Sequence, residues 1–172
     1  MFIINTKLLT RSALLIALGI ILPYIAHLTG IAGPIFLPMH LPPLLAGFIV
    51  GPIYGLIIGA ILPPLNFAVS GMPPMPTMIF MAVELAAFGL ITGILYKKFN
   101  VIISLVSAML VGRVIYALAF ALIIEFQNPL VIIGGGIATG LPGIIIQIVL
   151  IPIIVKALEN RKETARERVF SE

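Results

Sequence analysis

Residues 40–76 read HLPPLLAGFIVGPIYGLIIGAILPPLNFAVSGMPPMP, and the division of this stretch decides how the whole chain is organised. It is almost uncharged and carries eight prolines. Gly47, Gly51, Gly55 and Gly59 recur every four residues, a spacing that places small residues on one helix face, where a second helix can approach closely. Prolines interrupt the segment at both ends and near its middle. We therefore interpret it as a helical hairpin in a membrane, beside a cavity.

The composition excludes a soluble protein. The chain has 172 residues, of which 61% are hydrophobic and 9% are charged, whereas a soluble domain carries about 25% charged residues. The length accommodates about six spans of ~20 residues and leaves no room for a soluble domain. The net charge of +4 is attributed to cytoplasmic Lys and Arg, so we expect no nucleic-acid partner. The absence of cysteine excludes disulfides, thiolate catalysis and cysteine metal sites.

Charge distribution selects one division of residues 41–70. Taken as one span, this segment gives five spans and places the lysine pair 97–98 across the membrane from Lys7 and Arg11. Taken as two short spans, it places every Lys and Arg except Arg113 on one side, and the loops on the other side contain neither residue. The positive-inside rule therefore selects six spans. The first span has no convincing cleavage site of the signal-peptide type, so we expect it to stay in the protein.

We predict an all-α integral membrane protein, a six-transmembrane-helix bundle with N- and C-termini in the cytoplasm. The bundle forms one domain with a turn near Gly51-Pro52. The predicted spans cover 10–28, 41–51, 54–70, 77–96, 101–124 and 139–158. The predicted loops on the outer side cover 29–40, 71–76 and 125–138. A charged cytoplasmic tail covers 159–172.

Polar side chains fall in the middle and outer half of this predicted bundle. They are Glu84, Arg113, Asn66 and Gln147, together with Tyr116 one turn from Arg113 and His40 at the start of the second span. A charge at this depth costs at least ~2.5 kcal/mol and needs a partner. Glu84 and Arg113 either pair and hold two spans together, or face a pocket that opens outward and binds a polar solute. Arg113 suits a carboxylate or phosphate, and Glu84 accepts hydrogen bonds from hydroxyl or amine groups.

Ala13 and Ala17 form a small-xxx-small pair on the first span, which serves either ordinary helix packing or docking of another membrane protein. The chain has no GxxxxGK[ST] motif, no HExxH motif, no serine nucleophile motif and no Asp. We therefore expect no enzymatic activity, no metal site and no cofactor.

The segments HLPPLLAGFIVGPIYGLIIGAILPPL, GMPPMP, ELAAFGLITGILY and GRVIYA follow one another in an order that resembles the S components of energy-coupling factor (ECF) transporters. The resemblance covers residues 8–158. It implies a six-helix membrane bundle that captures vitamins or related micronutrients from outside, under the loop at 29–40. It also implies partners, namely a transmembrane T component and two ATPases. The family's AxxxA motif, which contacts the T component, matches Ala13 and Ala17.

The sequence therefore predicts a high-affinity substrate-binding subunit of an ECF-type importer in the bacterial cell membrane. The resemblance implies that the loaded subunit topples in the membrane, while the partner ATPases hydrolyse ATP. The alternative is an autonomous small transporter or channel for a polar solute, and a membrane enzyme is the third possibility. The motifs do not identify the vitamin.

Overall fold

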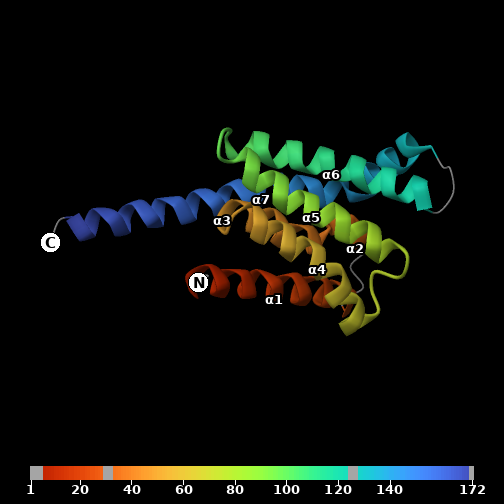
Figure 1. The fold of residues 1–172 in the computed structure, drawn as a ribbon, viewed down its shortest axis with the longest axis horizontal. Coiled ribbons are helices and arrows are strands. Elements are labelled where there is room, and N and C mark those ends of the chain that lie inside the picture. Colours follow the sequence, from red (N-terminus) through yellow and green to blue (C-terminus); the bar gives the residue numbers. More distant parts are fainter. Residues whose placement is uncertain (1–5, 29–32, 124–127, 171–172) are drawn as a thin grey trace.

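The computed structural model describes residues 6–28, 33–123 and 128–170, and all elements in these ranges are helical (Figure 1). Five of the described helices are long and apolar enough to cross a membrane, namely α1, α4, α5, α6 and α7. The elements are α1 (Thr6–Leu28), α2 (Gly33–Phe36), the 3-10 turn η1 (Pro38–His40), α3 (Leu41–Ile49), α4 (Pro52–Ser70), α5 (Thr77–Leu95), α6 (Val101–Ile123) and α7 (Pro129–Phe170).

The opening stretch forms two helices, α3 and α4, separated at Gly51. Gly51 has φ 115°, a backbone conformation that favours glycine, and Pro52 starts α4 with its fixed φ. The glycines of α4 pack against α5, with Gly55 beside Gly89 and Gly59 beside Leu85, so these two helices are antiparallel. In contrast, α3 runs parallel to α5. The two helices therefore form a hairpin that turns at Gly51-Pro52, where we predicted the turn.

Gly59 packs so closely that an added methyl group would collide with the backbone of Leu85. We expect Gly59→Ala to push α4 and α5 apart and to destabilise the fold by about 3 kcal/mol, at the upper end of the usual overpacking cost. Gly134→Ala is the matched control, because a Cβ there meets no atom within 4 Å. Thermal unfolding in detergent measures both, and equal midpoints for the two variants would contradict the close approach.

One helix, α3, occupies Leu41–Ile49 of the second predicted span, and its nine residues are too few to cross a ~30 Å core. Ahead of it, the chain runs through α2, Leu37 and η1, where we predicted a loop. Leu37 separates α2 from η1 and has a left-handed backbone with φ 49°. Of the loop predicted at 29–40, residues 29–32 lie outside the described residues. The remainder forms α2 and η1, and α2 packs against Gly143 of α7.

The last helix is longer than the sequence predicted. We expected a loop over 125–138, but α7 begins at Pro129 and continues to Phe170, through the glycines at 134–136 and into the charged tail. Residues 124–127, which include the end of the fifth predicted span, lie outside the described residues. Each glycine lowers helix propensity by about 1 kcal/mol, which favoured the loop. In a membrane, however, every backbone polar group needs an internal partner, and a helix supplies it.

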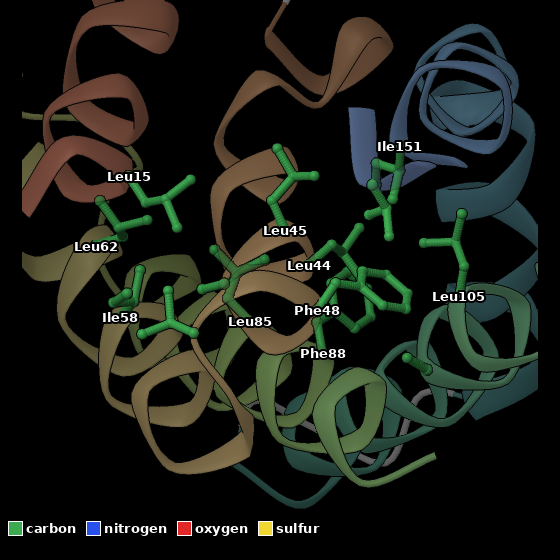
Figure 2. Packing of buried hydrophobic residues seen from close by; sticks show 14 of the residues in the cluster. Leu15, Leu44, Leu45, Phe48, Ile58, Leu62, Leu85, Phe88, Leu105 and Ile151 are labelled. Carbon is green, nitrogen blue, oxygen red and sulfur yellow. The ribbon is translucent and has the colours of Figure 1, made fainter. Parts of the chain in front are cut away.

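The core lies where α3 packs between α4, α5 and α7. It contains Leu44, Phe48, Leu85, Phe88 and Ile151, all of them buried (Figure 2). Large apolar side chains also cover the outside of the bundle, among them Leu122 on α6 and Leu130 on α7. A surface of this kind matches hydrocarbon rather than water.

The chain ends and turns separate into two groups along the bundle. The start of α1, the α5–α6 turn and the C-terminal end of α7 lie at one end in Figure 1, while the α4–α5 loop lies at the other. Lys97 and Lys98 belong to that α5–α6 turn. Next to it, the Tyr96 hydroxyl donates a hydrogen bond to the Glu159 carboxylate and ties α5 to α7.

Candidate functional site

A cavity of about 420 Å³ opens on the side of the α4–α5 loop. Its wall contains four prolines and three methionines together with several polar side chains. The lining residues are Pro23, Leu37, Pro38, Met39, His40, Ser70, Met72, Pro73, Pro74, Thr77, Met81, Glu84, Arg113, Tyr116, Gly135, Gly136 and Thr139. A mainly apolar cavity with a few convergent polar groups is the usual form of a small-molecule site.

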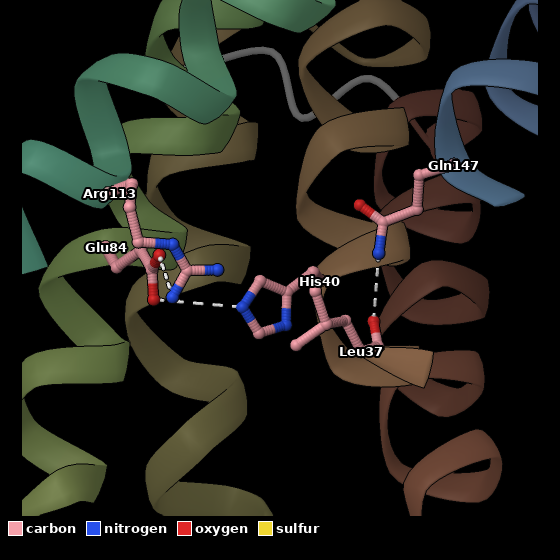
Figure 3. Close-up of polar contacts among 5 residues, drawn as sticks. All are labelled: Leu37, His40, Glu84, Arg113 and Gln147. Carbon is pink, nitrogen blue, oxygen red and sulfur yellow. Dashed lines mark hydrogen bonds and ion pairs between the residues drawn. The ribbon is translucent and has the colours of Figure 1, made fainter. Parts of the chain in front are cut away.

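Glu84 is the centre of the polar side of this cavity. Its Oε1 lies 3.2 Å from Nη1 of Arg113, and its Oε2 lies 3.7 Å from Nε2 of His40 (Figure 3). The carboxylate is 1% exposed. The three residues come from α5, α6 and η1, so three separate segments meet at one buried carboxylate. His40 directly precedes α3, and the packing of α3 against α5 brings it beside Glu84.

The residues of this cluster do not satisfy one another's hydrogen-bonding groups. Neither ring nitrogen of His40 and neither carboxylate oxygen of Glu84 has a hydrogen-bond partner among the described residues. Leaving such a group unsatisfied costs about 1–3 kcal/mol. Buried polar groups in native proteins almost always have a protein or water partner. A bound molecule with both donors and acceptors would supply these partners.

The Arg113 guanidinium is held on two sides. Its Cζ lies 5.9 Å from the ring centroid of Tyr116, an arrangement that attracts a cation to the ring face. On the other side lies Gly136, where an added Cβ would come within 3.2 Å of Nη1. Tyr116 is itself packed by Phe80, with ring centroids 6.0 Å apart. Arg113 is therefore positioned before any ligand arrives.

The structure brings four of the six predicted binding residues to the cavity, namely His40, Glu84, Arg113 and Tyr116. Asn66 is not among its lining residues. Its amide donates to the carbonyl oxygens of Gly19 at 2.9 Å and Leu62 at 3.0 Å, so it ties α4 to α1. Gln147 lies behind the cavity, where its amide donates to the Leu37 carbonyl oxygen at 3.1 Å. The two alanines, Ala13 and Ala17, are exposed on α1, away from the cavity.

Sequence reasoning missed the glycines of α7 and the hydroxyl side chains Ser70, Thr77 and Thr139 that line the cavity. The run Gly134–Gly136 was a usable signal, because three glycines in an apolar segment indicate close approach by another group. The hydroxyl residues carried no signal, since Ser and Thr are common in membrane helices.

Comparison with models of known protein families identifies the family of this chain. The family described as ECF transporter, substrate-specific component, matches residues 7–155. The chain belongs to this family. Searches of curated proteins and of solved structures gave no significant match. Substrate-specific components of ECF transporters bind substrate, and the chain is accordingly a multi-pass membrane protein that serves as the substrate-binding subunit of such a transporter.

Proposed function

We propose that this S component captures a water-soluble vitamin or related micronutrient from outside a bacterial cell and delivers it by toppling in the membrane. It does so in a complex with a T component and two cytoplasmic ATPases, which hydrolyse the ATP. The observation that carries the proposal is the buried cluster of Glu84, Arg113 and His40 at the 420 Å³ cavity. In it the Glu84 carboxylate and the His40 ring have ion-pair contacts but no hydrogen-bond partner among the described residues.

Each member of the cluster has a distinct role in this proposal. Arg113 presents guanidinium N–H groups to a carboxylate or another acceptor on the substrate. Glu84 accepts a hydrogen bond from a hydroxyl or amine group. His40 presents ring nitrogens that act as donor or acceptor. Tyr116 positions Arg113 and adds a ring face to the wall.

The chain crosses the membrane six times in this proposal, with both termini in the cytoplasm. Five crossings are continuous helices, and the broken segment from α2 to α3 makes the sixth. Broken helices are tolerated at membrane depth when they line a cavity, and they often form binding sites in transporters. The grouping of the α1 start, the α5–α6 turn and the α7 end at one side of the bundle supports this topology (Figure 1).

Ala13 and Ala17 form the docking site for the T component in this proposal. Both are exposed on α1, whereas Leu15 and Gly19 of the same helix face the protein. Small exposed residues one turn apart allow a partner helix to approach closely. The alternative that they pack within the bundle receives no support from this exposure.

Binding and uptake measurements test the proposed function. Native mass spectrometry of the purified protein should show one bound small molecule per chain. Equilibrium binding is then measured with labelled pantothenate, pyridoxine, biotin, thiamine and riboflavin, and with any molecule that co-purifies with the protein. We expect one of these compounds to bind. Vesicles that contain this chain alone should show no sustained uptake. Uptake by such vesicles would instead support the autonomous transporter, and an empty protein that binds none of these compounds would contradict substrate capture.

A further inference from the structure

A second, smaller cavity of about 140 Å³ lies behind the first, between α6 and α7. The two cavities share Leu37, His40 and Arg113 as lining residues. These three residues therefore form a partition with the outer cavity on one side and the second cavity, here called the inner chamber, on the other. A molecule seated against the cluster in the outer cavity is adjacent to the inner chamber.

Besides His40 and Arg113 of the partition, Gln147 is the polar residue that lines the inner chamber. Its side chain is 2% exposed, and its Nε2 donates to the carbonyl oxygen of Leu37 at 3.1 Å (Figure 3). Its Oε1 is buried and has no hydrogen-bond partner among the described residues. The amide is thus fixed at one end, and the buried acceptor at its other end has no partner among the described residues. An acceptor buried at membrane depth needs a donor, because the surrounding hydrocarbon supplies none.

The amide also holds the partition in place. Leu37 has a left-handed backbone, a conformation that disfavours residues with a side chain. Its carbonyl oxygen accepts hydrogen bonds from Gln147 Nε2 and from the backbone N–H of His40, the latter at 3.0 Å. These contacts fix the turn that carries His40 toward Glu84. Gln147 therefore has two functions to separate, namely positioning Leu37 and presenting Oε1.

We propose that the inner chamber is a second substrate subsite, which takes a small uncharged group that carries an N–H or O–H donor. This donor bonds to Gln147 Oε1, while the remainder of the substrate occupies the outer cavity. The inference rests on the proposed function and specifies the substrate class. The group is uncharged because the chamber wall beyond Gln147 and the partition is apolar, with Phe88, Val106 and Met109 in it. In the partition, Arg113 and His40 both contact the Glu84 carboxylate.

Filling the inner chamber from α6 tests the proposal without touching Gln147. Val106 lines the inner chamber and not the outer cavity, whereas Val111 on the same helix is 44% exposed on the outside. We expect Val106→Phe to weaken binding at least 30-fold and Val111→Phe to leave the affinity within about threefold. The probes are the five labelled vitamins above and any molecule that co-purifies with the wild-type protein. If Val106→Phe does not fold, Val106→Leu against Val111→Leu replaces the pair, with an expected loss of at least fivefold.

Gln147→Met removes both functions of the amide, and its comparison with the chamber-filling variants separates them. The variant keeps the length of the side chain and loses the bond to Leu37 and the Oε1 acceptor, so we expect a loss of at least about tenfold, the equivalent of one hydrogen bond to the substrate. If Gln147→Met weakens binding but the chamber-filling variants do not, Gln147 acts by positioning Leu37 and the subsite proposal is wrong. If all variants bind as the wild type does, the inner chamber holds water or lipid and the proposal is also wrong. If the wild-type protein binds no probe at all, the proposed function fails first and this inference fails with it.

Discussion

Arg113→Met is expected to destabilise the protein by about 3–5 kcal/mol and to remove measurable substrate binding. The variant leaves the Glu84 carboxylate, 1% exposed, without its cationic partner at 3.2 Å. Breaking a buried ion pair by removing one partner costs about 3–5 kcal/mol, because an uncompensated charge stays behind. Thermal unfolding in detergent measures the stability, and equilibrium binding of the labelled vitamins measures the affinity.

The double variant Glu84→Gln/Arg113→Met distinguishes a binding site from a structural ion pair. It removes both charges, so we expect stability to return to within about 1.5 kcal/mol of the wild type, as in other replacements of a buried pair by neutral residues. Binding should remain at least 100-fold weaker. Tyr96→Phe is the control, because it breaks an interhelical hydrogen bond far from the cavity and should leave the affinity unchanged. If the double variant folds and binds normally, Glu84 and Arg113 serve only to join α5 and α6.

The charge distribution led to residues that meet at the cavity. Placing the basic residues on one side gave each span a predicted direction, and this direction gave Glu84 and Arg113 similar predicted depths; the two side chains lie together in the structure. Depth alone does not specify which face of a helix a residue occupies. Asn66 lies at a similar predicted depth but faces α1, where it donates to Gly19. The sequence therefore indicated how deep each polar residue lies in the bundle, but not which of these residues contact one another.

The left-handed turn at Leu37, which separates α2 from η1, could not be predicted from the sequence. A leucine before a proline is expected to be extended, and nothing local favours φ 49°. The Leu37 carbonyl oxygen accepts a hydrogen bond from Gln147, which is 110 residues away in the chain. A contact of this sequence separation leaves no trace in local composition. The same holds for Gly136, whose space is filled by the guanidinium of Arg113 from another helix.

Ala13→Leu/Ala17→Leu is expected to abolish assembly with the T component and the ATPases while leaving substrate affinity unchanged. Both alanines are exposed on α1, and each is followed directly by a large exposed side chain, Leu14 or Leu18. Two added isobutyl groups would hold a partner helix away from the α1 backbone, and close backbone approach is what small residues permit. We expect the fraction of this chain that co-purifies with tagged T component and ATPases to fall at least tenfold, a loss of about 1.4 kcal/mol or more in binding free energy.

Ala68→Leu is the matched control for this docking prediction, because Ala68 is also an exposed alanine on a membrane helix, but on α4. Substitution there adds the same side chain to the apolar surface and should change neither assembly nor affinity. The two measurements together separate docking from folding, since a misfolded double variant would lose its substrate as well as its partners. Normal assembly of Ala13→Leu/Ala17→Leu would place the T component on another face of the bundle. Loss of assembly in Ala68→Leu as well would mean that any bulky addition to the outer surface blocks the complex, and the alanine pair would then have no special role.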